Sequence, residues 1–273
     1  MKKGLFFFIA AAVLSVPAFF SCSKTGNGSG ANTPDSLVLE TFSDSATYHL
    51  FGNPDLPAIK ACISLTAPSG EDTSSAAVKA RNDFMVNIMG NGYTGLPMED
   101  AARKFINTCV EEYRESVESK AKNRKKTAEE KWMNYETLIS TSTVYNGNGI
   151  WCYSCDSYIY TGGAHGLGTT VCFVYDVANS KPIALNEVFK EGSLPDVLKL
   201  ITERIGKKGN ADAYWMELVT VSENFAVGEN GITWYYNPYE IAPYYIGTTA
   251  VTIPYDELEP HIVKDSPVYS IIR

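Results

Sequence analysis

The sequence predicts an α+β fold in which helices lie on one face of mostly antiparallel sheets, with two linked subdomains as the alternative to a single domain. Three observations support this class. Helical periodicity, with apolar residues three or four positions apart, recurs between residues 72 and 117 and again after Ser193. Alternation of apolar and polar residues dominates residues 132–177, and Gly/Asn turns interrupt it. Helices and strands therefore form separate runs along the chain, as in α+β proteins.

The first predicted elements are two extended segments followed by a helix. Residues 48–66 are rich in apolar positions, and Gly52-Asn53-Pro54 divides them into two strands. A helix begins after Asp72 or Thr73, either of which has a side chain suited to capping, and it ends at Gly90-Asn91-Gly92.

A second helix and three consecutive antiparallel strands come next. The helix starts at Pro97, a favoured first helical residue, and its apolar stripe is formed by Ala102, Phe105, Cys109, Tyr113 and Val117. The strands occupy residues 132–177, with turns at Asn146-Gly147-Asn148-Gly149 and at Gly162-Gly163-Ala164-His165-Gly166.

The C-terminal part begins with a capped helix and continues as short strands. Ser193 and Asp196 predict a capping box for a helix that ends at Gly206, with its apolar stripe at Leu194, Leu198, Ile201 and Ile205. A hairpin follows over residues 224–236, with its turn at Glu229-Asn230-Gly231. A last strand at 251–254 and a short helix at 255–262 complete the chain.

The first residues predict export. Two lysines precede an apolar run, and Ser21-Cys22 stands where a bacterial lipoprotein is cut and acylated, so we expect residues 1–21 to be a signal peptide. The Ser/Gly-rich start of residues 22–40 suits a flexible tether, and a diacylated Cys22 would hold the protein at a membrane. Cleavage after Ala18 and a permanent membrane helix over residues 4–20 remain alternatives, although Pro17 and the short length disfavour the second. We expect a cell-envelope location, with the lipid anchor in the inner or the outer membrane and the folded domain in the periplasm or outside the cell.

The composition excludes some partners. The chain has 273 residues, and removal of the leader leaves 21 basic and 31 acidic residues, a net charge of −10. Nucleic acid is disfavoured because its phosphates need neutralising Lys and Arg residues, whereas a basic protein partner would be attracted.

Five cysteines remain once Cys22 is assigned to the lipid. Cys152 and Cys155 form a CxxC pair, but we expect them in a strand, where residues three apart point to opposite faces, so neither a redox pair nor a zinc site is favoured. Structural cysteines are the favoured interpretation for the set that also includes Cys62, Cys109 and Cys172. A disulfide between Cys155 and Cys172 across a hairpin is a further hypothesis.

Two segments carry a family resemblance: Tyr160-Thr161-Gly162-Gly163-Ala164-His165-Gly166 and Tyr236-Asn237-Pro238-Tyr239-Glu240-Ile241-Ala242-Pro243-Tyr244. With Val251-Thr252-Ile253-Pro254-Tyr255 they resemble the extracytoplasmic domain of RsiV-type anti-sigma factors and PdaC-type peptidoglycan deacetylases. The resemblance implies two α+β subdomains, residues 41–185 and 186–273. It implies a domain without established catalytic activity, which in sensor proteins recognises lysozyme. The chain has neither a sigma-binding segment nor the deacetylase's Asp/His metal motif.

The two motifs also hold the candidate site residues. His165 lies in a glycine-rich turn and Glu240 is its carboxylate partner in a hydrolase or esterase hypothesis. The structural alternative is that the glycines supply positive φ angles while His165 hydrogen-bonds a neighbouring carbonyl. For a binding function, the candidates are His165, Tyr236, Asn237, Tyr239, Glu240 and Tyr244, because Tyr presents large contact area at low entropic cost.

We expect no cofactor and no metal, since His49, His165 and His261 are isolated in the sequence. The leading functional hypothesis is a lipid-anchored cell-envelope binding module that recognises a lysozyme-like extracellular protein or peptidoglycan. The alternative is a cell-wall hydrolase or esterase that uses His165 and Glu240.

Overall fold

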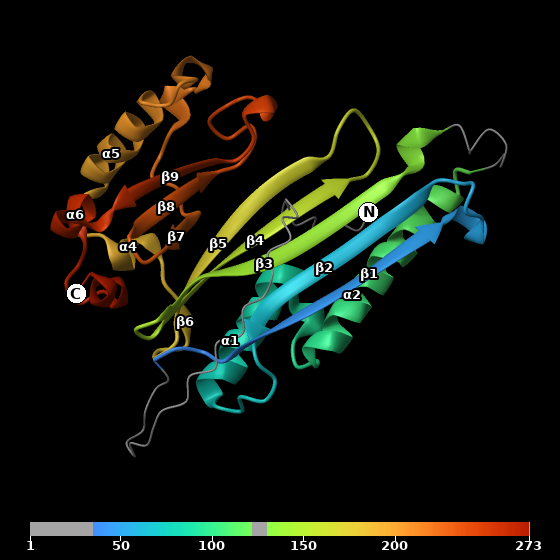
Figure 1. Cartoon of the computed structure of the whole chain (residues 1–273), viewed down its shortest axis with the longest axis horizontal. Coiled ribbons are helices and arrows are strands. Elements are labelled where there is room, and N and C mark those ends of the chain that lie inside the picture. Colours follow the sequence, from blue (N-terminus) through green and yellow to red (C-terminus); the bar gives the residue numbers. More distant parts are fainter. Residues whose placement is uncertain (1–34, 122–129, 273) are drawn as a thin grey trace.

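The computed structural model describes residues 35–121 and 130–272, and it contains two sheets (Figure 1). The larger sheet has six strands in chain order: β1 (Leu39–His49), β2 (Ala58–Pro68), β3 (Tyr135–Gly147), β4 (Ile150–Tyr160), β5 (Leu167–Asp176) and β6 (Lys181–Pro182). The smaller sheet contains β7 (Phe225–Val227), β8 (Gly231–Tyr236) and β9 (Thr249–Pro254). All neighbours are antiparallel except β2 and β3.

The helices fall into two groups. Helices α1 (Ser75–Met89) and α2 (Met98–Tyr113) connect β2 to β3 and cover one face of the larger sheet. That crossover returns the chain in the direction of β2, which makes the β2–β3 pair parallel. Helices α4 (Leu185–Val188), α5 (Leu194–Gly206) and α6 (Tyr255–Leu258) pack with the smaller sheet. The predicted α+β class is confirmed.

The sequence patterns located the helices correctly, but they did not identify the N-terminal capping contacts of α1 and α5. Ser74, rather than Asp72 or Thr73, caps α1, because its side chain accepts a hydrogen bond from the Ala77 amide. Ser193 precedes α5 as predicted, yet its hydroxyl donates to the Lys190 carbonyl, so the predicted capping box does not form. The buried residues of α5 are Val197, Ile201 and Ile205, whereas the predicted stripe residues Leu194 and Leu198 are exposed and half-buried.

Strand β4 lies between two apolar cores. Trp151, Tyr153 and Cys155 face α1 and α2, where Trp151 and Tyr153 stack at 4.3 Å between ring centroids. Ile150 and Cys152 face the smaller sheet on the other side. The two groups of elements therefore pack against each other through β4 and β5, and burial of large aromatic side chains on both sides stabilises this arrangement.

The cysteines behave as structural residues. Cys152 and Cys155 point into different cores, as the strand period predicts. All five described cysteines are free thiols, so the hypothesis of a Cys155–Cys172 disulfide is wrong. The strand register explains why: Cys155 lies opposite Val171, while Cys172 shares the opposite face of the sheet with Cys152. Burial raises the pKa of the Cys152 thiol to about 12.

The predicted signal peptide 1–21, the lipid site Cys22 and most of the predicted tether lie outside the described residues. The last part of the segment 22–40 belongs to the fold, because Leu37 is buried and its amide donates to the Asn146 side chain. Within residues 35–121 and 130–272, no helix combines the length and apolar character that crossing a membrane requires.

Candidate functional site

The two sequence motifs meet in space although about 70 residues separate them in the chain. The first forms the turn between β4 and β5, and the second forms most of the connection between β8 and β9. Both connections lie at the upper edge of the molecule in Figure 1. This junction between the larger and the smaller sheet is the candidate site.

Two asparagine side chains hold the junction together. The Asn237 carboxamide accepts a hydrogen bond from the Thr170 amide at 2.7 Å and donates to the Thr170 carbonyl at 3.1 Å. The Asn224 carboxamide accepts from the Cys172 amide at 2.8 Å and donates to the same Thr170 carbonyl at 2.8 Å. These amides satisfy backbone groups along the part of β5 that β6 leaves unpaired, and so take the place of a neighbouring strand. Asn237 is therefore a structural link between the two sheets.

Three rings form a stacked series that we call the aromatic row: His165, Tyr244 and Tyr239. The His165 and Tyr244 rings stack at 3.9 Å between centroids, and Tyr239 stacks on Tyr244 at 5.8 Å. The Tyr244 hydroxyl donates to the Gly166 carbonyl at 2.8 Å, which joins the two motifs directly. The row thus contains one residue of the β4–β5 turn and two residues of the β8–β9 connection.

The His165 ring has a defined tautomer. Its Nδ1 lies 2.9 Å from the Gly166 carbonyl oxygen, and because a carbonyl can only accept, Nδ1 carries the proton. Nε2 of the neutral ring is then left as a hydrogen-bond acceptor. Such a hydrogen bond to a neighbouring carbonyl is the structural alternative that was predicted for His165 from the sequence. The residue is also exposed and therefore accessible to a ligand.

The backbone around the row is constrained. Tyr239 has a φ angle of 72°, a left-handed conformation that is rare for a bulky residue, and its side chain is 54% exposed. Gly162 and Gly163 have positive φ angles, as predicted, but Gly166 does not. Gly166 is needed for space, because a Cβ atom there would lie 2.3 Å from the Tyr158 ring.

Two of the predicted binding residues, Tyr236 and Glu240, have structural contacts of their own. Tyr236 is only 3% exposed and its hydroxyl donates to the Thr220 carbonyl, so the prediction that its side chain belongs to a binding surface is corrected. Burial raises its pKa. The Glu240 carboxylate is exposed but accepts a hydrogen bond from the Asn237 amide at 2.9 Å, which stabilises the turn. Tyr245, which the site prediction omitted, is 75% exposed beside Tyr244.

The arrangement does not form a catalytic pair. Among the described residues, neither a hydrogen bond nor an ion pair joins His165 to Glu240. The same residues contain no group of three or more His, Cys, Asp or Glu side chains placed to hold a metal ion. What the row offers chemically is a set of π-faces, a histidine Nε2 and tyrosine hydroxyls.

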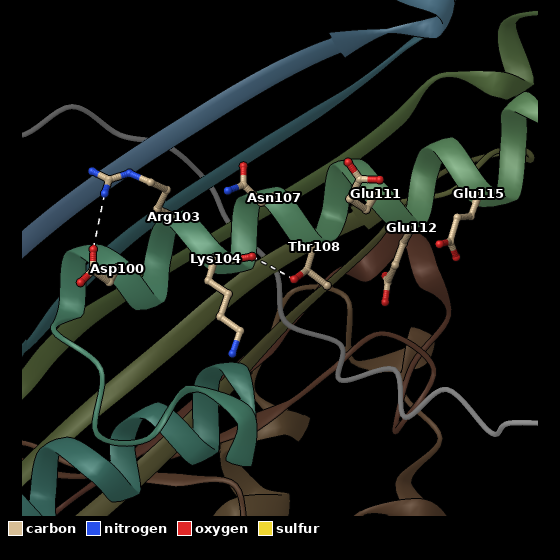
Figure 2. Close-up of a pocket in the computed structure, with 8 residues that line it drawn as sticks. All are labelled: Asp100, Arg103, Lys104, Asn107, Thr108, Glu111, Glu112 and Glu115. Atoms are coloured by element: carbon tan, nitrogen blue, oxygen red, sulfur yellow. Dashed lines mark hydrogen bonds and ion pairs between the residues drawn. The ribbon is translucent and has the colours of Figure 1, made fainter.

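A second feature is a shallow depression of about 430 Å³ along α2 (Figure 2). All eight lining residues belong to that helix or its continuation: Asp100, Arg103, Lys104, Asn107, Thr108, Glu111, Glu112 and Glu115. Figure 2 shows Lys104, Thr108, Glu112 and Glu115 on one side of the helix and the others on the opposite side. Because the groups on the two sides of the helix point apart, we do not assign a site to the depression as a whole.

Comparison with known proteins agrees with the motifs. Residues 61–168 match a family model described as deacetylase PdaC, and residues 186–256 match one described as a protein of unknown function, DUF3298. The family resemblance is confirmed. His165 belongs to the first matched region, whereas Tyr239 and Tyr244 belong to the second, so the aromatic row connects the two. Together the matches indicate a cell-envelope-associated, extracytoplasmic domain.

Solved structures share this fold. A DUF3298 family protein from Bacteroides fragilis has a TM-score of 0.78 at 24% identity, with 87% of this chain and 98% of the other covered. A DUF3298 family protein from Pseudomonas aeruginosa has a TM-score of 0.58 at 16% identity, with 85% and 97% covered. Comparison with curated proteins finds no match.

Proposed function

We propose that this chain is a cell-envelope binding domain, anchored by lipid on Cys22, whose aromatic row recognises a lysozyme-like extracellular protein or peptidoglycan. The observation that carries the proposal is the stack of His165, Tyr244 and Tyr239 across the junction of the two sheets, in which His165 and Tyr239 are exposed and Tyr244 is half-buried. Such a stack is held in place before a ligand arrives, so little side-chain entropy is lost on binding.

Binding is better supported than hydrolysis. A hydrolytic site needs a base within hydrogen-bond reach of the proton that it removes. Glu240 instead stabilises the turn through the Asn237 amide, so the His165 ring has no carboxylate partner among the described residues. The groups left over are recognition groups, namely ring faces, hydroxyls and one imidazole acceptor.

Two properties favour the stated ligands. The net charge of −10 for residues 22–273 would attract a basic protein such as a lysozyme-like muramidase. Exposed aromatic faces suit the apolar faces of sugar rings as well as protein hot spots, which supports peptidoglycan as the second ligand. Neither ligand needs a metal or a cofactor at this surface.

The binding proposal is tested by measuring the affinity of the full chain for lysozyme and for purified peptidoglycan at low and moderate salt. We expect Tyr239→Ala and His165→Ala each to weaken binding by about tenfold, which corresponds to about 1.4 kcal/mol of binding free energy. The matched control is Val38→Ala, which removes an exposed side chain at the opposite end of the larger sheet. Absence of binding to both ligands at low salt would refute the proposal.

The anchor is tested separately. Cys22→Ser should release the protein from membranes and abolish incorporation of labelled palmitate, because the Cys22 sulfur is the atom to which the lipid is attached. Unchanged membrane association of the variant would contradict lipidation at Cys22 and leave the binding test unaffected.

A further inference from the structure

A cavity of about 720 Å³ lies between the helices and the larger sheet, separate from the aromatic row. Helix α2 packs mainly on β1 and β2, as Figure 1 shows. The ends of β3 and β4 near the β4–β5 turn are therefore not covered by a helix, and the cavity lies there. Its volume falls in the range of pockets that bind small molecules, roughly 300–1,000 Å³.

The interior of this cavity is apolar. Its floor and walls come from three strands and both helices, and the apolar lining includes Ile59, Ile88, Met89, Phe105, Ile139 and Ile159. Tyr113 and Tyr135 add an aromatic wall, with their rings edge to face at 5.2 Å. The Tyr113 hydroxyl donates to the Met133 carbonyl and is therefore already satisfied. The lining thus favours a ligand with an apolar body.

The rim carries two carboxylates that have no partner in the part of the chain that the structure describes. Glu112 and Glu115 line the cavity, and among the described residues neither carboxylate has a hydrogen bond or an ion pair. Their neighbours differ, since Glu111 pairs with Arg114 at 2.9 Å and Glu118 accepts from the Tyr48 hydroxyl at 2.6 Å. Among residues 35–121 and 130–272, those that line the cavity include no Lys, Arg or His.

The geometry of α2 changes at this rim. Residues Arg114–Glu118 continue the helix as a π-helical turn, and both Glu115 and Ser116 of that turn line the cavity. Such turns are rare and occur frequently at functional sites. Figure 2 shows that Thr108, Glu112 and Glu115 project from the same side of the helix, whereas Glu111 projects from the other. The two unpaired carboxylates are therefore presented together.

The geometry points to a binding site for a small amphiphilic cation, with its apolar body in the cavity and its protonated amine between Glu112 and Glu115. An ammonium group supplies the charge-assisted hydrogen bonds that the two carboxylates lack. A carboxylate or phosphate head would be repelled at the same rim. The thiol of Cys109, whose pKa burial and the Glu112 charge raise to about 12, adds no competing charge.

The test compares three ligands that share one tail: decylammonium and decanoate, each below its micelle concentration, and decanol below its solubility limit. Calorimetric titration of the full chain should show that decylammonium binds at least about tenfold more tightly than decanoate, with decanol between them. Equal affinities of the cation and the anion, or no binding of any of the three, would overturn the proposal.

Variants locate the bound ligand. Thr137→Trp places a large side chain in the cavity from β3, and it should weaken decylammonium binding at least about tenfold. Leu138→Trp, the adjacent residue on the opposite face of the same strand, is the matched control and should leave the affinity unchanged. If circular dichroism shows that Thr137→Trp fails to fold, Ile159→Trp from β4 replaces it. A folded, cavity-filling variant with unchanged affinity would refute the site.

The role of the rim is tested by Glu112→Gln combined with Glu115→Gln. The preference for decylammonium over decanoate should fall below about threefold in this double variant. The control Glu111→Gln removes one charge from the other side of α2 and should keep most of the preference. A full preference in the double variant would show that the acidic surface as a whole, and not this rim, attracts the cation.

Discussion

The two halves of strand β4 have different surroundings. Residues 150–155 are all buried, because α1 covers one face of the strand and the smaller sheet covers the other. Residues 158–160 are only half-buried, and the strand there leads into the β4–β5 turn that carries His165. One end of a single strand thus holds the layers together, while the other end is left accessible for the aromatic row and the cavity. Stability and recognition are separated along the same element.

The largest expected effect is a loss of stability from a substitution in the buried half of β4. Trp151→Ala removes a fully buried indole that stacks on Tyr153, and we expect a loss of about 3–5 kcal/mol in the free energy of unfolding. Ile159→Ala, in the accessible half, should cost less than about 2 kcal/mol because its side chain is only half-buried. Urea denaturation of both variants measures the difference, and equal losses would contradict the separation.

The next effect concerns the junction. Asn237→Ala leaves the Thr170 amide without its partner, and we expect a destabilisation of about 1–3 kcal/mol. Asn210→Ala is the control, because Asn210 is exposed and its side chain has no hydrogen bond among the described residues. Thermal unfolding followed by circular dichroism distinguishes the two. A loss no larger than that of the control would show that the asparagine link is dispensable.

A smaller effect comes from the backbone at Tyr239. Because its φ angle is positive, Tyr239→Gly should be more stable than Tyr239→Ala by about 1 kcal/mol, while both lose the ring. The order should reverse at Tyr245, which lies in a short 3-10 helix where Ala is preferred. Unfolding of the four variants tests this. The same order of stabilities at both positions would contradict a strained backbone conformation at Tyr239.

The smallest effect is a pH dependence at the centre of β4. Burial raises the pKa of Asp156 above its ordinary value of 3.8, although the Thr170 hydroxyl donates to its carboxylate. The stability that Asp156 contributes is therefore complete below that value and is lost as the pH rises through the folded-state pKa. Asp156→Asn should raise the melting temperature at pH 7 and leave it unchanged at pH 3. A gain of the same size at both pH values would contradict this assignment.

The sequence predicts the parts of this fold that depend on local signals. The turns at 146–149 and 162–166 placed β3, β4 and β5 correctly, because glycine-rich turns and alternating strands are recognisable over short windows. The start of β1 was missed: Thr41, Ser43 and Ser45 are exposed residues on an edge strand, and Asp44 interrupts the apolar positions of the other face, Phe42 and Ala46. The parallel pairing of β2 with β3 spans two helices and has no local signature.

The candidate site was predicted in part for the same reason. The motifs identified His165, Tyr239 and Tyr244, but only the packing of the two sheets brings the three rings together. The hydrogen-bonding partners of Asn237 and the burial of Tyr236 depend on long-range contacts that strand periodicity does not reveal. The cavity beside α2 was not anticipated, since it depends on how the helix is placed over the sheet.

The most direct test of the central claim is hydrogen exchange of the full chain with and without saturating lysozyme or peptidoglycan fragments. We expect new protection at residues 161–166 and 237–247, the two segments that form the aromatic row, and no change at residues 150–155, which are already buried. Protection confined to other surfaces, with both of these segments unchanged by either bound ligand, would contradict it.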